Sequence, residues 1–184
     1  MTYKLSKGFT LVELLIVIAV IGVLAGILLV AVNPLEQFAR GRDASRKTAV
    51  GQLGAAVQAF YTASGGTAYP TQTIGATGWM NTLRTQGEIQ NNITGPIYSI
   101  AGTSACNGGA AEFNFCYATD TTTWGAVWAR MESRAEGGQG GTGSKCPVAG
   151  QVAYFIFHSA AGQAGRICSA GVYVPTSAAP VFVP

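Results

Sequence analysis

The chain has 184 residues, of which 48% are hydrophobic and only 10% are charged, and its formal net charge is +3. This length allows one domain with a buried core, and the sparse charge predicts the polar, weakly charged surface that is common in exported proteins. Without a strong basic excess the composition argues against binding to a phosphate backbone, so no specific nucleic-acid partner is predicted.

A short basic segment at residues 1–8 precedes a long apolar run at residues 9–32. A helix of 24 residues is about 36 Å long, enough to cross the ~30 Å hydrocarbon layer of a membrane. The run is too long for the apolar part of an ordinary secretory signal, and more helical sequence follows it. We therefore predict a retained transmembrane helix.

Glu13 is the single charged residue of this apolar run. A carboxylate in hydrocarbon costs on the order of 2.5 kcal/mol or more unless it is paired or lies near the interface. Periodicity leaves two interpretations open. In the first, Glu13 lies at the helix end and its carboxylate reaches the lipid headgroups. In the second, a positively charged group pairs with it inside an assembly.

Residues 7–14, KGFTLVEL, are similar to the cleavage motif of type IV pilins and type II secretion pseudopilins. The resemblance implies a membrane peptidase that cuts after Gly8 and methylates the new N-terminal residue, Phe9. It also implies that Glu13 pairs with the terminal amine of a neighbouring subunit. Cleavage would then create the cation that this carboxylate needs, and the strongly coupled pair would fix subunit register.

The resemblance extends over residues 4–70 and implies a subunit of a helical filament made of copies of itself. It implies a single-pass protein of the inner membrane before assembly and an extracellular or periplasmic filament afterwards. The implied partners are a prepilin peptidase, a platform protein and a cytoplasmic assembly ATPase. The role would be structural, in adhesion, motility, DNA uptake or secretion, and the sequence does not choose among these or between pilin and pseudopilin.

Three further residues bear on such an assembly. Pro34 lacks a backbone donor and disfavours helix at the residue before it, so a kink or break is predicted there. Gly22 and Gly26 have the spacing that allows close helix approach in membranes, although chance explains the pair equally well in a chain with 25 glycines. The resemblance implies that the stretch from Gly22 to Pro34 unwinds locally in the filament.

We predict an α+β fold in which the long N-terminal helix packs on a C-terminal antiparallel β-sheet, as in pilins. The expected parts are a leader at 1–8, an apolar helix at 9–32, an amphipathic helix at 33–64 and an exported globular domain at 65–184. The amphipathic helix carries an apolar stripe at Ala49, Leu53, Ala56, Val57 and Phe60.

The charges on this second helix, at Arg40, Arg42, Arg46 and Lys47, are interpreted as a solvated face. Asp43 and Lys47 are expected to form an i,i+4 pair. Four strands are predicted after the helix from alternating apolar residues. They lie at 113–117, 124–128, 152–158 and 166–174, with a turn at 160–162.

The four cysteines are Cys106, Cys116, Cys146 and Cys168, and none forms a C-x-x-C pair. With a single histidine, the chain offers poor spacing for a metal site, and no cofactor or metal is predicted. Two disulfides are favoured instead. Pairing Cys106 with Cys116 and Cys146 with Cys168 closes two short loops, although the sequence does not establish which of three connectivities is present.

Two observations keep an alternative open. Four basic residues follow the apolar run and two precede it, and this distribution alone would keep the C-terminal domain in the cytoplasm. The cysteines and the cleavage motif argue for export. The alternative to a filament subunit is a single-span anchored binding domain or enzyme that never polymerises. No catalytic set with sensible spacing is present in the sequence, so no enzymatic activity is predicted.

Overall fold

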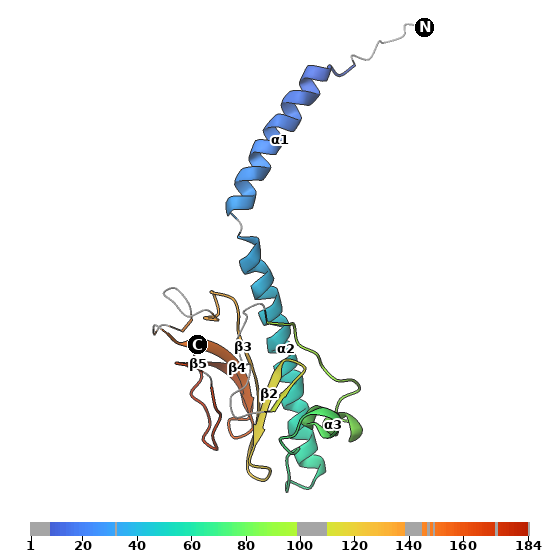
Figure 1. The fold of residues 1–184 in the computed structure, drawn as a ribbon, viewed down its shortest axis with the longest axis vertical. Helices are drawn as coiled ribbons and strands as arrows, with labels where there is room; N and C mark the ends of the chain where they lie inside the picture. The colour runs from blue at the N-terminus through green and yellow to red at the C-terminus, as the bar shows by residue number, and fades with distance from the viewer. Residues whose placement is uncertain are drawn as a thin grey trace, which may run out of the picture. The chain divides into compact units, whose positions relative to one another are not determined.

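The computed structural model describes residues 8–31, 33–98, 110–138, 145, 146, 148, 150–171 and 173–183. The chain divides into two units, Met1–Gln37 and Phe38–Pro184. The first contains helix α1, Leu11–Ala31 (Figure 1). Helix α2, Pro34–Ala63, begins in the first unit and continues through the second. The predicted break lies between the two helices, where proline provides the first residue of α2.

The second unit combines helices with one sheet (Figure 1). After α2 come a 3₁₀ turn, η1, at Gly75–Thr77 and a short helix, α3, at Trp79–Thr85. The five strands are β1 (Ala110–Glu112), β2 (Phe115–Thr119), β3 (Gly125–Arg130), β4 (Val152–His158) and β5 (Gln163–Ser169). They pair antiparallel in sequence order. The predicted α+β class, with a long N-terminal helix and an antiparallel sheet, is confirmed.

The apolar stripe of α2 forms the main core against one face of the sheet. Leu53 and Val57 are fully buried, together with Val127 of β3 and Trp79 of α3. Phe60, the last residue of the predicted stripe, is only partly buried at the edge of this cluster. Burying large apolar side chains contributes roughly 1.5–3 kcal/mol each, so this stripe fixes α2 on the sheet.

The other face of the sheet is also apolar. Trp128 and Tyr154 lie there beside Ile156, and Tyr173 and Phe182 of the C-terminal segment pack against them. Successive strand residues point to opposite faces, so β3 sends Val127 to one cluster and Trp128 to the other. Burial of both faces explains why nearly all residues of β3 are inaccessible.

The strand predictions were only partly right. Phe113 and Asn114, expected within a strand, form the turn between β1 and β2 with φ values of 49° and 69°. Two residues of positive φ are the requirement of the type I′ hairpin turn, whose twist matches that of the flanking strands. The preceding strand β1 was not predicted, and β5 begins and ends earlier than expected.

The solvated-face interpretation of the charged segment of α2 is wrong for Arg46, whose side chain is fully buried. Asp43 pairs with Arg46 rather than with Lys47, at 3.1 Å, and Lys47 pairs with Glu136 at 2.8 Å. Glu136, and Glu132 with which Arg46 also pairs at 3.1 Å, lie far along the chain in residues 131–138, so an analysis of the helix alone could not place them.

Candidate processing and assembly segment

The predicted cleavage site precedes α1 at residues that have no regular secondary structure. Gly8 and Phe9 are exposed, and 85% of the Phe9 surface is accessible. A peptidase needs an accessible backbone outside regular secondary structure, and this segment meets that requirement. The remaining leader residues lie outside the described part of the chain.

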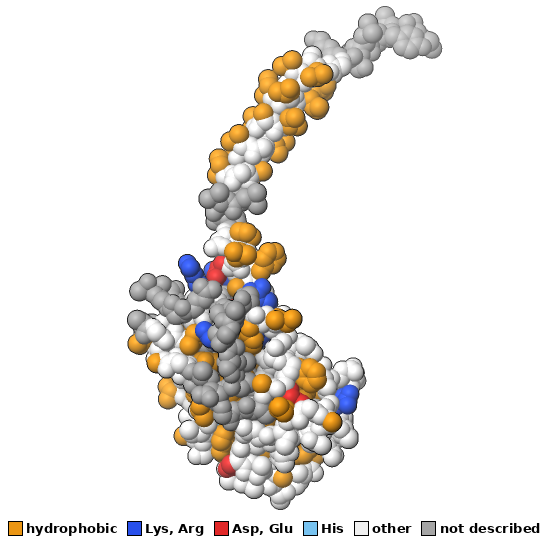
Figure 2. All heavy atoms as spheres, viewed as in Figure 1, with side chains coloured by type: hydrophobic (Ala, Val, Ile, Leu, Met, Phe, Trp, Pro, Cys, Tyr) orange, Lys and Arg blue, Asp and Glu red, His pale blue; other side chains and the backbone are white. Residues whose placement is uncertain are grey.

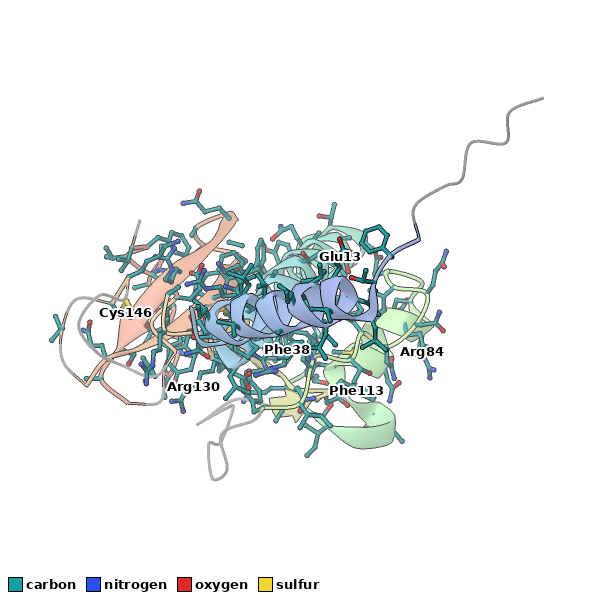
Figure 3. The ribbon with its side chains drawn as sticks, turned by 90° about the horizontal axis from the view of Figure 1, so that it is seen from above. Glu13, Phe38, Arg84, Phe113, Arg130 and Cys146 are labelled. Carbon is teal, nitrogen blue, oxygen red and sulfur yellow. A yellow bond between two sulfur atoms is a disulfide. The ribbon has the colours of Figure 1, made fainter. Side chains whose placement is uncertain are left out.

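Glu13 has a partner within its own helix terminus. Its Oε2 accepts hydrogen bonds of 2.8 Å from both the backbone N–H and the hydroxyl of Thr10. In return the Thr10 hydroxyl accepts from the Glu13 N–H at 3.3 Å. This reciprocal arrangement is a capping box, which satisfies donors that the first helical turn leaves unpaired. Figure 3 shows Glu13 at the start of α1.

Thr10 is therefore a site residue that the sequence interpretation missed. Its signal was present, because a threonine followed three residues later by glutamate before an apolar run predicts a capping box. The box gives Glu13 hydrogen-bond partners but no positive charge. Among the described residues, therefore, the hydrogen-bond partners of this carboxylate are the neutral groups of Thr10 at the end of an apolar helix.

Large apolar side chains are exposed along the whole described length of α1, and Figure 2 shows those on one face. Residues Leu11–Leu28 have a mean hydropathy of 3.0, and none of this window is buried. By length and composition it is the one candidate membrane span in the part of the chain that the structure describes. An all-round apolar helix has no polar face for water, so lipid or other apolar helices must cover it.

Gly22 and Gly26 leave gaps in this apolar surface. A Cβ atom built on either residue would meet nothing within 4 Å. Residues four apart lie on the same side of a helix, so the two glycines open a single shallow notch. Such a notch allows another helix to approach closely.

The break before α2 is stabilised locally. Pro34 is the first helical residue, where its missing N–H costs nothing, and the Asn33 side chain accepts from the Glu36 N–H at 3.4 Å. Asparagine is a preferred N-cap, so the sequence ends one helix and starts the next at a defined residue.

A buried ion-pair cluster lies at the start of α2 in the second unit. Arg46 donates to Asp43 and Glu132, each at 3.1 Å, and stacks 4.1 Å above the ring of Tyr98. Asp43 also accepts from the backbone N–H groups of Glu132 and Ser133 at 2.8 Å. These contacts connect α2 to the segment after β3. Removing one partner would be costly, because it would leave a buried charge unpaired.

A second cluster lies beside it around Glu136. Its carboxylate contacts Lys47 at 2.8 Å, Arg166 at 3.2 Å and Lys145 at 3.5 Å. Partial burial opposes ionisation, but the hydrogen bond and charge of Lys47, with the charges of Arg166 and Lys145, outweigh it. The pKa of Glu136 therefore lies below its ordinary value.

The predicted disulfide between Cys146 and Cys168 is confirmed, with Cα atoms 5.6 Å apart. It joins the segment before β4 to β5. Cys116 is buried on β2, and its expected partner, Cys106, lies outside the described residues. The described residues include no group of three His, Cys, Asp or Glu side chains placed to hold a metal ion.

The comparisons with known proteins bear on the first unit. Residues 3–29 match the family model described as the prokaryotic N-terminal methylation motif. The chain therefore carries the N-terminal signature of type IV pilins and pseudopilins, as its sequence predicted. Neither the comparison with curated proteins nor that with solved structures gave a match.

Proposed function

We propose that this protein is a structural subunit of a type IV pilus or a related filament. It would be inserted as a prepilin, cleaved after Gly8, methylated at Phe9 and polymerised through its apolar helix. The observation that carries the proposal is the methylation motif at residues 3–29 joined to a span, Leu11–Leu28, that none of the described residues buries. An apolar surface of this kind needs lipid before assembly and neighbouring subunits afterwards.

In the proposed filament Glu13 is the assembly residue. Cleavage after Gly8 frees an amine on Phe9, and this amine on a neighbouring subunit supplies the positive charge that Thr10 cannot. In a low-dielectric surrounding a charged pair is strongly coupled, so an out-of-register subunit would leave an unpaired carboxylate in an apolar environment. The capping box presents the carboxylate at the beginning of the helix, close in sequence to the new terminus.

The other features of the segment have roles in the same proposal. Gly22 and Gly26 would allow neighbouring helices to approach closely. Asn33 and Pro34 would provide the break at which the helix unwinds or bends on packing. The four parts would then be the leader at 1–8, the assembly helix at 9–32, the connecting helix at 33–64 and an exported domain at 65–184.

The proposal places the unassembled subunit in the cytoplasmic membrane with a single span, and the assembled one in an extracellular or periplasmic filament. Its partners would be identical subunits, a prepilin peptidase, a platform protein and an assembly ATPase. The finer role would be adhesion, motility, DNA uptake or secretion.

One observation favours the alternative of an anchored domain that does not polymerise. The hydrogen bonds from Thr10 give Glu13 partners within its own chain, so a neighbouring amine is not its only source of stabilisation. A lone anchored subunit could keep this capped carboxylate near the headgroups, where its cost is small.

Mass spectrometry of the mature N-terminus tests the proposal. We expect a chain beginning with N-methylated Phe9, recovered in filaments that shear from the cell surface. A chain that retains Met1 contradicts processing. A methylated chain that stays in the membrane fraction and never appears in sheared filaments contradicts a surface pilus, and would favour a short pseudopilin filament instead.

A further inference from the structure

The charges of the second unit are unevenly distributed, although the formal net charge of the whole chain is only +3. Five basic residues with solvent access lie around the first turns of α2 and the segment that follows β3, and we call this group the basic collar. It consists of Arg40, Arg42, Lys47, Arg134 and Lys145. Figure 2 shows Lys and Arg side chains gathered near the beginning of α2.

Contacts hold the collar together. Arg42 on α2 contacts Glu132 at 2.6 Å, while Lys47 and Lys145 share the carboxylate of Glu136. Arg134 lies between these two glutamates in sequence and is exposed. The collar is therefore one surface drawn from three segments of the chain rather than a run of charges along one helix.

The neighbouring acids do not neutralise the collar. Asp43 is buried against Arg46, and Glu136 also has Arg166 at 3.2 Å to balance it. Two carboxylates remain to offset the five collar charges: Glu132, and Glu36, which lies one helical turn before Arg40 on α2. The group therefore has a net charge of +3. A surface of this sign attracts anions over a Debye length of about 8–10 Å at physiological salt.

Elsewhere the second unit has the opposite balance. Away from the collar, between α2 and β3, the described charged side chains with solvent access are Arg84, Glu88 and Asp120. Figure 3 shows Arg84 on the side of the unit away from Arg130 and Cys146. Among the described residues, the excess of positive charge thus lies at the end of the unit where α2 enters it.

With α1 in the membrane, as proposed, chain connectivity keeps Arg40 within a short length of chain from it. Arg40 follows the end of α1 by nine residues, which is ~14 Å of chain when helical. The headgroup layer extends roughly 5–8 Å beyond the hydrocarbon, and arginine and lysine side chains reach several ångströms further. A cluster of basic residues this close to a membrane span is the sequence feature that attracts anionic lipid headgroups.

The geometry points to a second membrane contact: the basic collar docks the globular unit on anionic phospholipid headgroups while the subunit awaits assembly. This inference rests on the proposed membrane anchoring of α1, but not on polymerisation. It applies to either leaflet, because the collar recognises headgroup charge rather than one side of the membrane. When the subunit leaves the membrane for the filament, the collar would then lose its contacts with lipid headgroups and form contacts with other anionic groups or with water.

Energy transfer from tryptophan to a dansyl-labelled lipid headgroup can test this in the full chain. All three tryptophans, Trp79, Trp124 and Trp128, lie in the second unit, so they report its distance from the membrane. We expect about twofold or greater transfer in phosphatidylcholine vesicles containing roughly one quarter phosphatidylglycerol than in pure phosphatidylcholine. About 0.5 M sodium chloride, which shortens the Debye length to ~4 Å, should abolish the difference.

The variant Arg40→Gln/Arg134→Gln/Lys145→Gln should lose the lipid dependence, whereas Arg84→Gln should keep it as a matched control. Equal transfer in both vesicle types, or an equal loss in the control, overturns the inference. The inference is also overturned if the chain in detergent binds a short DNA duplex through the collar but its energy transfer does not depend on the lipid. The salt response of the unaltered chain tests the same idea even if the triple variant misfolds.

Failure of the anchoring would look different. A chain that alkaline carbonate washes from the vesicles would contradict the membrane span itself, and the collar inference with it. A chain that stays in the vesicles but ignores headgroup charge overturns only the collar inference.

Discussion

At the scale of single residues, Glu13 is where the two proposed functions diverge. Its carboxylate accepts from the N–H and hydroxyl of Thr10 at 2.8 Å, and the filament proposal gives it a neighbouring amine as well. Capping needs only an acceptor, which glutamine also supplies, whereas pairing with an amine needs the negative charge. Substitutions can separate these roles.

We expect Thr10→Ala to keep most filament formation, because the carboxylate remains, and Glu13→Gln to lose it. A tenfold loss of sheared filaments corresponds to only ~1.4 kcal/mol of assembly free energy, well within the range of one coupled ion pair. The measurement is subunit recovered in the sheared fraction, normalised to total subunit. Equal defects in the two variants would mean that Glu13 acts only as a cap.

His158, the single histidine, is expected to contribute to the response of the second unit to mild acid. The ring is buried, stacks 5.4 Å from Trp124 and contacts the Thr176 carbonyl at 2.9 Å. Burial lowers the pKa of His158 from its usual range, and the hydrogen bond to Thr176 only partly opposes this. The imidazole is therefore neutral in the folded unit over a wider pH range than in the unfolded chain.

Since the unfolded chain binds this proton more readily, stability should fall as pH drops below the unfolded pKa of ~6.5. The loss by pH ~5.5 should not exceed about 1.4 kcal/mol from this one group. Denaturant unfolding at the two pH values, followed by tryptophan fluorescence in detergent, measures it. His158→Gln should flatten the response over this interval, and an unchanged slope in that variant would assign the effect to other groups.

At the scale of elements, the packing of α2 on the sheet depends on one close approach. A Cβ on Gly54 would come within 2.2 Å of Cγ of Phe157 on β4, whereas one on Gly51 would meet nothing within 4 Å. The two positions lie on the same helix, one turn apart, so they share helix propensity and differ in their surroundings. Only the first is constrained by the sheet.

Gly54→Ala should therefore destabilise the second unit by about 2 kcal/mol, because the well-packed ring must move. Gly51→Ala should instead stabilise it by up to about 1 kcal/mol through helix propensity. Denaturant midpoints of the two variants in the same detergent compare them directly. A similar gain in both would show that α2 does not approach β4 as closely as described.

The helices and strands differ in how well they could be predicted from the sequence. The α1–α2 boundary was predictable because Pro34 acts on its own neighbours. The β1–β2 hairpin was not, because Phe113 and Asn114 replace the usual Asn-Gly of a type I′ turn and read as a continuing strand. The environment of Arg46 was also unpredictable, since its partner Glu132 lies 86 residues away and only tertiary folding brings them together.

At the scale of the whole molecule, the sequence informs the proposed roles of the first unit, whereas the basic collar of the second unit needs the structure. The methylation motif and the apolar span are local patterns, so the sequence alone predicts processing at Gly8 and Phe9 and an assembly role for Glu13. The capping partner Thr10 was equally local and could have been found from its spacing. The basic collar could not, because a net charge of +3 says nothing about where the charges gather once three segments fold together.

The two units also differ in what they need in order to be stable. Every described side chain from Gly8 to Leu28 is exposed, whereas the two buried clusters draw only on residues from Ala49 onward. The ion pairs that fix α2 begin at Arg42, and the Asn33 cap precedes them. The described cores and ion pairs of the second unit therefore come from residues outside α1, and we expect this unit to fold without it.

A chain that begins at Asn33 should accordingly fold without detergent and remain soluble. It keeps the cap, both cores and the Cys146–Cys168 disulfide, so its free energy of unfolding should differ by less than about 1 kcal/mol from that of the full chain in detergent. Size-exclusion chromatography and cooperative thermal unfolding by circular dichroism measure this. A matched chain with Asn33→Ala should lose about 1 kcal/mol as the cap is removed. Aggregation of the oxidised, truncated chain would show instead that the second unit depends on α1, and that the membrane helix is part of the fold as well as the means of assembly.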